Sequence, residues 1–262
     1  MNNVNKTLYI PLYGKALVSS RGIILSDKTA EEIWAKEGFL LKGKSKSVWL
    51  AYYMAMRSAV YDAWLTSKIK NHPDGVVLHI GCGMDSRIKR VSEKCSHWYD
   101  IDFPEVIKER KKYYVEDSYY QMIEADMRRG DWENKVKETG TALIIMEGVS
   151  MYFSPEEIDT LLQGIAKHFR SVMLLMDCYT EKAARISKYK NPINDVGVTT
   201  VYGYDDPEKL VENAGLKFLA EHTMTPKYLI DALQGAEKMI FRNIFAGKFA
   251  KNMYRMYEFS SL

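Results

Sequence analysis

Short apolar runs alternate with helical patterns from Val76 to the end of the chain. The fourth and fifth runs are apolar almost throughout, as in parallel strands that helices cover on both faces, so these two strands should be central. The alternation of strands and helices predicts an α/β fold with a seven-stranded, mostly parallel sheet. We expect the strands at Val76–Ile80, His97–Ile101, Gln121–Ala125, Ala142–Met146, Val172–Asp177, Leu216–His222 and Tyr254–Phe259.

Two of the intervening helices carry clear boundary signals. Residues 154–157 (SPEE) offer an N-cap hydroxyl, a proline in the first turn and a glutamate three residues after the cap, so a helix should begin there. A second helix is expected after Asp206, with Pro207 in its first turn and Gly215 as its C-terminal stop.

The pattern before Val76 is helical. Helical signals cover Lys28–Lys36 and an aromatic, methionine-rich stretch at Val48–Ile69. In the second stretch the side chains at positions 53, 56, 60 and 64 share one broad face, which we interpret mainly as a surface that packs on the sheet.

These patterns predict two parts of the chain. Residues 1–70 are expected to form an N-terminal helical lid, and residues 71–262 a sheet domain. The segment near 179–205 is long for a connection between elements, and long loops at this edge of a sheet often cover ligands, so we expect it to be a substrate-covering insertion.

Composition narrows the class of protein. With 37 Lys and Arg against 34 Asp and Glu, the net charge of +3 is too near balance to predict a nucleic-acid groove. No apolar segment approaches the ~20 residues that cross a bilayer, and no signal peptide is apparent, so we expect a cytoplasmic protein without a membrane partner. The spacing of Cys82, Cys95 and Cys178 predicts neither a disulfide framework nor a metal site, and the oligomeric state is left open.

The first strand ends in a glycine loop, within the sequence VVLHIGCGMDSR. Gly81 and Gly83 flank Cys82 and let the backbone turn tightly and approach a ligand. This pattern predicts a nucleotide-like cofactor. Position 86 is Ser, so the third glycine of the dinucleotide fingerprint is absent, which argues against a nicotinamide cofactor.

An acidic residue follows about 20 positions after this loop, at the spacing of a ribose-binding carboxylate. We prefer Asp102 over Asp100 for this role, because Asp102 lies nearer the carboxyl end of its strand. The alternative is that Asp102 only caps the helix that follows.

Two further strand ends supply polar groups at the same edge. Asp126 and Met127 follow the third strand, where the carboxylate could accept from an adenine amino group and the methionine could pack on the ring. Glu147 and Gly148 follow the fourth strand. A buried carboxylate needs a partner, so Glu147 should meet either the cationic part of a cofactor or an arginine such as Arg57 or Arg87.

Taken in order, these motifs resemble the leucine carboxyl methyltransferase-like enzymes, which include bacterial O-methyltransferases of polyketide tailoring. The resemblance implies a Rossmann-like fold of the S-adenosylmethionine-dependent methyltransferases, with S-adenosylmethionine as cofactor. It is carried by Arg57-x-x-x-x-Asp62, the G-x-G-x-D-x-R loop from Gly81 to Arg87, Asp102-Phe-Pro104, and the E-G-x-x-x-Y motif from Glu147 to Tyr152.

The resemblance also implies roles for these residues. Arg57 would pair with the carboxylate of the cofactor, since its planar fork matches a carboxylate. Gly81 would pass close to the methionine part, and Asp102 would hold the ribose. Asp126-Met127 would frame the adenine, and Glu147 would lie near the amino-acid or sulfonium end. For the other charged residues of the loop, Asp85 and Arg87, the resemblance implies that they hold the loop in shape and do not contact the cofactor directly.

Methyl transfer requires in-line positioning and exclusion of water, and it needs no metal. A carboxylate acceptor arrives ionised, whereas a phenol or alcohol would profit from a general base, and both kinds stay open. The catalytic residues are therefore unassigned. Tyr152, Tyr202 and Arg21 are positioning candidates, and we expect an aromatic acceptor pocket that also includes Tyr9, Tyr13, Arg185, Tyr189 and Tyr204.

The favoured function is an S-adenosylmethionine-dependent O-methyltransferase that acts on a carboxylate or hydroxyl of a small molecule, such as a polyketide-like metabolite. Methylation of a protein C-terminal carboxylate is the alternative within the same chemistry. Two alternatives do not involve methyl transfer. An NAD(P)-dependent oxidoreductase shares the glycine loop and the ribose-binding aspartate, and a noncatalytic S-adenosylmethionine-binding protein would share the whole site.

Overall fold

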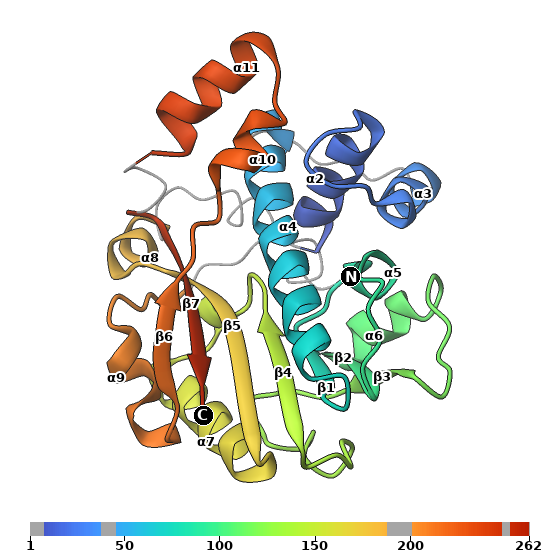
Figure 1. The fold of residues 1–262 in the computed structure, drawn as a ribbon, viewed down its shortest axis with the longest axis vertical. Helices are drawn as coiled ribbons and strands as arrows, with labels where there is room; N and C mark the ends of the chain where they lie inside the picture. The colour runs from blue at the N-terminus through green and yellow to red at the C-terminus, as the bar shows by residue number, and fades with distance from the viewer. Residues whose placement is uncertain (1–7, 38–45, 188–200, 248–251, 262) are drawn as a thin grey trace.

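The computed structural model describes residues 8–37, 46–187, 201–247 and 252–261 (Figure 1). Seven strands form one sheet in the order β3-β2-β1-β4-β5-β7-β6. Neighbouring strands from β3 to β5 pair in parallel, while β7 pairs antiparallel with both β5 and β6. The strands are β1 (Val76–Ile80), β2 (His97–Asp102), β3 (Tyr120–Glu124), β4 (Thr141–Met146), β5 (Ser171–Tyr179), β6 (Lys217–Glu221) and β7 (Tyr254–Ser260).

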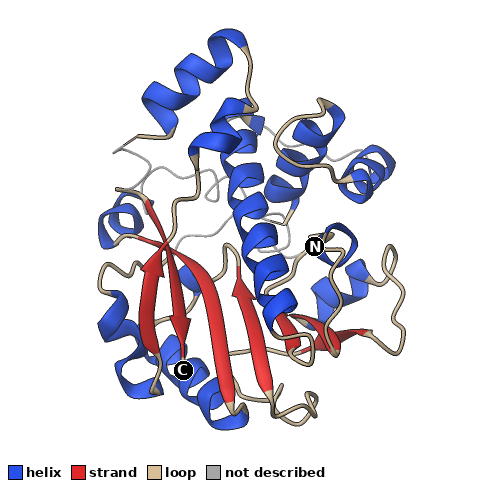
Figure 2. Ribbon diagram, viewed as in Figure 1, coloured by secondary structure: helices blue, strands red, loops and turns tan. Residues whose placement is uncertain are grey.

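Helices flank this sheet and also gather around one end of it (Figure 2). The longest, α4, runs from the sheet into the group formed by α2, α3, α10 and α11 (Figure 1). The α-helices are α2 (Tyr9–Ser20), α3 (Lys28–Glu37), α4 (Val48–Asn71), α5 (Arg87–Arg90), α6 (Pro104–Arg110), α7 (Pro155–His168), α8 (Glu181–Ser187), α9 (Pro207–Val211), α10 (Lys227–Asp231) and α11 (Gly235–Ile240). Two short 3₁₀ turns, η2 (Ser150–Tyr152) and η4 (Glu212–Ala214), and the π-helical turn η5 (Phe241–Phe245) complete the described elements.

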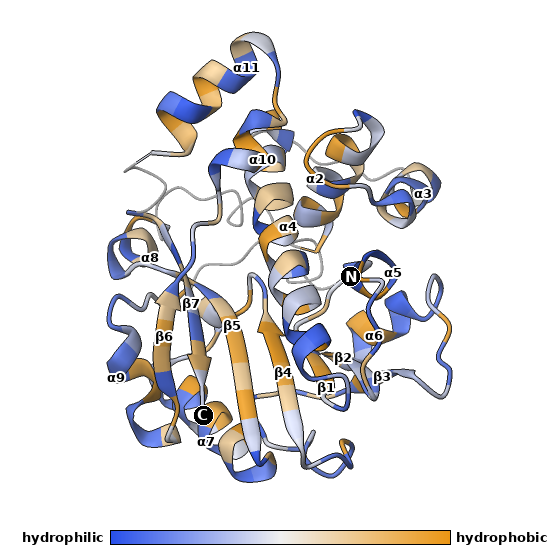
Figure 3. Cartoon of the chain, viewed as in Figure 1, coloured by the Kyte–Doolittle hydropathy of each residue, from blue (hydrophilic) through white to orange (hydrophobic). Residues whose placement is uncertain are grey.

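Alternate side chains of the central strands pack into two separate hydrophobic clusters, because successive residues of a strand face opposite sides of the sheet. On one side, Leu143 of β4 lies in a cluster with residues of α2, α3 and α4. On the other side, the next residue, Ile144, packs with Leu162 and Ile165 of α7. The orange β4 and β5 ribbons in Figure 3 reflect this burial on both faces.

All seven predicted strands are confirmed, with ends that differ by at most two residues. The predicted start of α7 is also confirmed, because Ser154 and Glu157 form a reciprocal capping box. Asp206 caps α9 through the N–H groups of Glu208 and Lys209, and Gly215 ends the following turn with a φ of +66°.

The predicted helices before the first strand are confirmed as α3 and α4. The sequence patterns did not predict α2, nor α10, α11 and η5 between β6 and β7.

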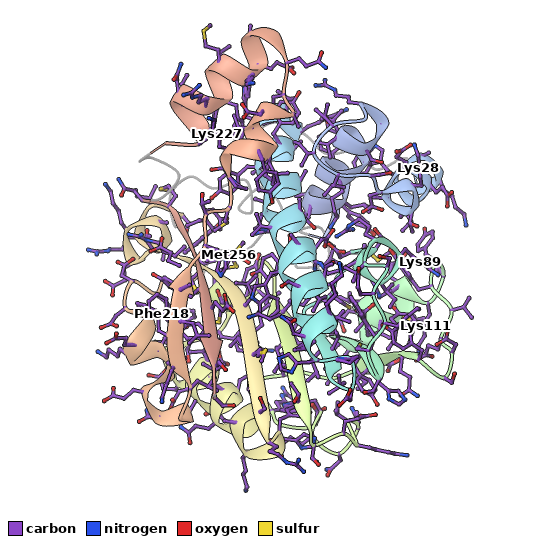
Figure 4. All side chains as sticks on the ribbon, viewed as in Figure 1. Lys28, Lys89, Lys111, Phe218, Lys227 and Met256 are labelled. Carbon is purple, nitrogen blue, oxygen red and sulfur yellow. The ribbon has the colours of Figure 1, made fainter. Side chains whose placement is uncertain are left out.

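Lys28, Lys89 and Lys111 lie at the periphery of the molecule (Figure 4). In the described part of the chain, no helix combines the length and apolar character of a membrane span.

Candidate cofactor and acceptor site

A cavity of about 560 Å³ lies at the carboxyl edge of the parallel strands. One side is lined by the loops that follow β1, β2, β3 and β4, and the other by α2, the N-terminal half of α4, η5 and the start of β7. Every residue predicted to bind the cofactor lines this cavity: Arg57, Gly81, Cys82, Gly83, Asp102, Asp126, Met127, Glu147 and Gly148.

Gly81 occupies a position that only glycine can fill. Its φ of +67° lies in the left-handed region. A Cβ atom at this position would also lie 2.2 Å from Cγ1 of Val149, far inside van der Waals contact. The N–H of Gly81 donates to the carbonyl of Ile101 at 2.8 Å, so the loop after β1 is fastened to the end of β2.

Asp102 receives two backbone amides. Its Oδ2 accepts from the N–H of Gly83 and its Oδ1 from the N–H of Phe103, both at 2.8 Å. Burial raises the pKa of Asp102 to about 6, and these two hydrogen bonds only partly oppose the shift. The capping alternative is wrong, because the N-cap position of α6 is Phe103 and no side chain caps this helix. Each carboxylate oxygen of Asp102 keeps a lone pair for a ligand.

Asp100, the alternative ribose ligand, is completely buried and is absent from the cavity lining among the described residues. It forms an ion pair with Arg110 and accepts hydrogen bonds from Tyr120 and Trp98. Burial would raise the pKa of Asp100, but Arg110 and His79 outweigh burial and hold this pKa at about 2. Its side chain is thus engaged within the interior, which favours Asp102 as the ligand.

Arg57 lies between two carboxylates. Its Nε donates to Oε1 of Glu147 and its Nη1 to Oδ2 of Asp177, each at 3.1 Å. Its third nitrogen, Nη2, has no hydrogen-bond partner among the described residues. A Cβ atom at Gly148, which has a φ of +70°, would lie 3.0 Å from this nitrogen. The guanidinium is thus held by two carboxylates, and Arg57, which lines the cavity, keeps Nη2 as an available donor.

Glu147 is paired with arginine, which is one of the two alternatives that the sequence left open for this carboxylate. It accepts from Arg57 and also from Nη2 of Arg87. Burial alone would raise the pKa of Glu147, but the two guanidinium groups outweigh burial and hold this pKa below its usual range. Glu147 is therefore ionised at neutral pH and is a fixed negative charge on the cavity wall.

The charged residues of the glycine loop organise the loop itself. Asp85 accepts from the N–H of Arg87 at 2.6 Å and forms ion pairs with Arg90 and Lys15. Arg87 also pairs with Asp62 at 2.6 Å, which connects the loop to α4. Because Lys15 belongs to α2 and is itself nearly inaccessible to solvent, its pair with Asp85 joins α2 to the loop.

Asp126 and Met127 lie at the far end of the same edge. The carboxylate of Asp126 accepts from Nε of Arg128 at 2.8 Å and from Nη2 at 2.7 Å. The side chain of Met127 is buried, and Arg128 lies over the ring of Phe103. The hydrogen bond from Arg128, and to a lesser degree its charge, lower the pKa of Asp126, so this carboxylate is ionised.

Of the predicted acceptor residues, Tyr152 lines the cavity, and Arg21 and Tyr202 do not. Arg21 is exposed and contacts Tyr52 and Glu237 at the outside of α2. Tyr202 packs partly buried and donates its N–H to the carbonyl of Met151. Four other members of the predicted pocket are described and do not line the cavity: Tyr9 is buried in α2, Tyr13 contacts Trp34, Arg185 pairs with Glu181, and Tyr204 donates to the carbonyl of Phe153. Tyr189 lies outside the described residues.

Several cavity and neighbouring residues were not singled out from the sequence for this site. Asp177 is the one carboxylate in a mostly apolar strand, and this exception to the pattern could have marked it as a partner of a buried cation. Tyr53 was interpreted as a packing residue, although it lines the cavity. Other aromatic residues of the lining had no distinguishing pattern, among them Trp49, Phe153, Tyr179, Phe245 and Tyr254.

Similarity to known proteins agrees with this geometry. Residues 3–166 match the leucine carboxyl methyltransferase family. The tetracenomycin polyketide synthesis O-methyltransferase TcmP of Streptomyces glaucescens is 27% identical over 261 residues, which are 97% of each chain. The S-adenosyl-L-methionine-dependent methyltransferase dpfgK of Gibberella zeae is 24% identical over 242 residues, 83% of this chain and 81% of that protein.

Solved structures share the fold. Magnesium protoporphyrin IX methyltransferase (ChlM) from Synechocystis PCC 6803, with bound SAH, has a TM-score of 0.53 at 12% identity and covers 88% of this chain and 93% of its own. The same enzyme with bound SAM also has a TM-score of 0.53, over 89% and 92%. These structures bear out the predicted Rossmann-like methyltransferase fold.

The family match extends over well more than half of the chain and includes the helix that carries Arg57, the glycine loop, Asp102 and the motif that begins at Glu147. The chain belongs to the leucine carboxyl methyltransferase family, and its cofactor is the S-adenosylmethionine used by these methyltransferases.

Proposed function

We propose that the protein transfers the methyl group of S-adenosylmethionine to a carboxylate oxygen of a small molecule. The observation that carries this proposal is a single cavity with two unlike ends. One end is formed by charged strand-edge residues around Arg57 and Asp102, and the other by tyrosine, tryptophan, phenylalanine and methionine side chains. The volume of about 560 Å³ lies in the range of sites that enclose a small ligand.

The charged end suits the cofactor. Arg57 would bind the carboxylate of S-adenosylmethionine through Nη2, the donor that Glu147 and Asp177 leave available. Asp102 would accept from the ribose hydroxyls. Gly81 lines the cavity and would pass close to the methionine part of the cofactor, while Val149 packs against this glycine where a side chain would collide.

The outer part of the same edge would take the adenine. Asp126 would accept from the adenine amino group, and Met127 would pack against the ring. Arg128, which lines the cavity and pairs with Asp126, would hold this carboxylate in place. Cys82 and Gly148 would contact the cofactor through their backbone, since each lies at the turn after a strand.

The apolar end favours a carboxylate as the acceptor group. Among the described residues that line this end, the titratable side chains are Tyr53, Tyr152, Tyr179 and Tyr254. Burial raises the pKa of Tyr53 and of Tyr254 above that of free tyrosine, so both are neutral donors at pH 7. A phenol or alcohol would find no base there, whereas a carboxylic acid of pKa about 4 arrives ionised.

Bound S-adenosylmethionine supplies a methyl carbon that is already activated by a positive sulfur. The work left to the chain is to position two reactants in line and to exclude water. Arg57 and Asp102 would fix the cofactor at two points. The tyrosine hydroxyls would donate to one acceptor oxygen and leave the other directed at the methyl group.

A small-molecule acceptor also agrees with the similarity to TcmP, a protein of polyketide synthesis, over 97% of the chain. The predicted division into a lid of residues 1–70 and a domain of residues 71–262 belongs to the same proposal. In it, α2 would close over the acceptor while Lys15 ties that helix to Asp85 of the glycine loop.

The test compares two acceptors that differ in the reactive group. The protein is incubated at pH 7 with S-adenosylmethionine and either naphthalene-2-carboxylate or 2-naphthol, and the products are identified by mass spectrometry. We expect a methyl ester from the carboxylate, recognised by its hydrolysis in mild base, and little ether from the naphthol. Faster ether formation would contradict a carboxylate acceptor. Cofactor binding without turnover of any acceptor would favour the noncatalytic alternative.

A further inference from the structure

Trp49 of α4 and Phe245 of η5 form a stacked pair that we name the aromatic wall. Their ring centroids are 5.1 Å apart and their planes differ by 11°. Both residues line the cavity and both are partly buried, so part of their ring surface faces the cavity. A flat, polarisable surface of this kind is suited to stacking with another ring.

The aromatic wall lies at a defined distance from the cofactor end. Trp49, Tyr53 and Arg57 recur at intervals of four residues along α4, so they lie along one stripe of the helix. At a rise of 1.5 Å per residue, Trp49 and Arg57 are separated by about 12 Å along the helix axis. The wall is therefore about two turns of α4 away from the arginine that would hold the cofactor, and an extended, fused ring system would reach the wall from the methyl group more readily than a single ring.

The position of Phe245 is set by a rare helical geometry. The N–H of Ala246 donates to the carbonyl of Phe241, five residues back, at 2.9 Å. Such π-helical turns are uncommon and often occur at functional sites. The ring of Phe241 is completely buried and contacts Tyr52 and Phe245, at centroid distances of 6.1 and 6.0 Å. Phe241 thus anchors the turn, and the turn directs Phe245 to the cavity.

The lining around the wall is apolar. Among the described residues that α4 supplies before Arg57, together with η5 and the start of β7, no charged side chain lines the cavity. Leu50, Met54 and Met253 are further apolar residues that these elements and the residue before β7 contribute to the lining. A ligand part that lies there is recognised by its shape and by contact with ring faces, because ionic groups are lacking.

We propose that Trp49 and Phe245 determine acceptor specificity by stacking with a planar, fused aromatic ring system that carries the methylated group. This inference rests on the proposed function and names the class of acceptor that its cavity takes. Under it, the segment from α10 to η5 is the acceptor-recognition element, and Glu237 fastens that segment to α4 through the hydroxyl of Tyr52 at 2.5 Å.

The experiment uses two probes of the same carbon skeleton, naphthalene-2-carboxylate and its saturated counterpart decahydronaphthalene-2-carboxylate. Binding of each is measured by calorimetry with the complete protein saturated with S-adenosylhomocysteine. We expect the aromatic probe to bind roughly three- to tenfold more tightly, the ratio that an aromatic stacking contact supports. Equal affinities, or failure of both probes to bind, would overturn the inference.

Variants assign that preference to the wall. Phe245→Leu should remove the preference for the aromatic probe while the affinity for S-adenosylhomocysteine stays unchanged. Phe218→Leu is the matched control, because Phe218 lies on β6 at the edge of the sheet (Figure 4) and packs on Tyr257 and Phe259. If Phe245→Leu still prefers the aromatic probe, the inference is overturned. If the wild-type protein does not bind S-adenosylhomocysteine at all, the proposed function is contradicted instead.

Discussion

Arg57 and Asp177 are 120 positions apart in the chain, and Nη1 of the arginine donates to Oδ2 of the aspartate at 3.1 Å. Both side chains are almost inaccessible to solvent. Burial raises the pKa of Asp177, and the positive charge of Arg57 opposes the shift. This pair, completed by Glu147, places a rigid guanidinium where α4 meets the carboxyl edge of the sheet.

Replacement of Arg57 by lysine should weaken cofactor binding more than it weakens folding. Lysine keeps a positive charge between Glu147 and Asp177, but one ammonium cannot contact both and also reach the position of Nη2. We expect the dissociation constant for S-adenosylhomocysteine to rise roughly 10- to 100-fold, as for the loss of a charged hydrogen bond. Calorimetry and a thermal melt measure the two effects. Arg242→Lys, an exposed exchange of the same kind, is the control, and equal affinities in both variants would refute this role.

Cofactor affinity should depend on pH through Asp102. Its pKa is about 6, so above that pH the carboxylate is ionised and would accept hydrogen bonds from the ribose hydroxyls, whereas protonation below that pH would remove an acceptor. We expect the dissociation constant for S-adenosylhomocysteine to rise about tenfold between pH 7 and pH 5. The same titration of Asp102→Asn should give weaker binding with a flatter pH profile. Parallel profiles for the two proteins would exclude Asp102 as the titrating group.

Gly81→Ala should destabilise the fold by more than backbone strain alone. Gly22 is the matched control, because it has a similar φ of +66° and no atom within 4 Å of the added Cβ. We expect Gly22→Ala to lower the free energy of unfolding by about 1 kcal/mol. Gly81→Ala should lower it by a further 1–3 kcal/mol, roughly, because the new Cβ collides with Val149. Urea denaturation measures the free energy of unfolding of both variants. Similar decreases would show that Val149 can move aside without cost.

Lys15→Met should loosen α2. The variant keeps most of the side-chain volume, and Asp85 keeps its ion pairs with Arg87 and Arg90. We therefore expect the free energy of unfolding to fall by about 1–3 kcal/mol. Hydrogen exchange should become faster at the amides of α2 and stay unchanged in α7, on the opposite face of the sheet. If the exchange of α2 is unaltered, the pair with Asp85 does not anchor this helix.

The strands could be predicted from the sequence because their burial is local in origin. β4 and β5 are buried on both faces, so apolar runs mark them without reference to distant residues. The capping box at Ser154 is equally local. α2 could not be predicted in this way, because its buried residues include Gly14 and Lys15, whose burial depends on partners far along the chain.

The same difference separates the two ends of the cavity. Gly81, Asp102 and Glu147 follow directly after strands, and parallel strands bring such positions to one edge, so spacing was sufficient to collect them. Trp49 and Phe245 meet only because a connection near the C-terminus folds back on α4. No periodicity in the sequence marks that contact, and the tyrosines chosen in its place, such as Tyr202, pack elsewhere.

Titration of the protein with S-adenosylhomocysteine and with reduced nicotinamide dinucleotide tests the cofactor site most directly. We expect one S-adenosylhomocysteine per chain and no binding of the nicotinamide. Asp102→Ala should bind S-adenosylhomocysteine roughly tenfold more weakly, or less tightly still, whereas Asp117→Ala, which removes an exposed carboxylate, should keep full affinity. Binding of the nicotinamide in place of S-adenosylhomocysteine, or wild-type affinity in a folded Asp102→Ala protein, would show that this cavity is not an S-adenosylmethionine site held by Asp102.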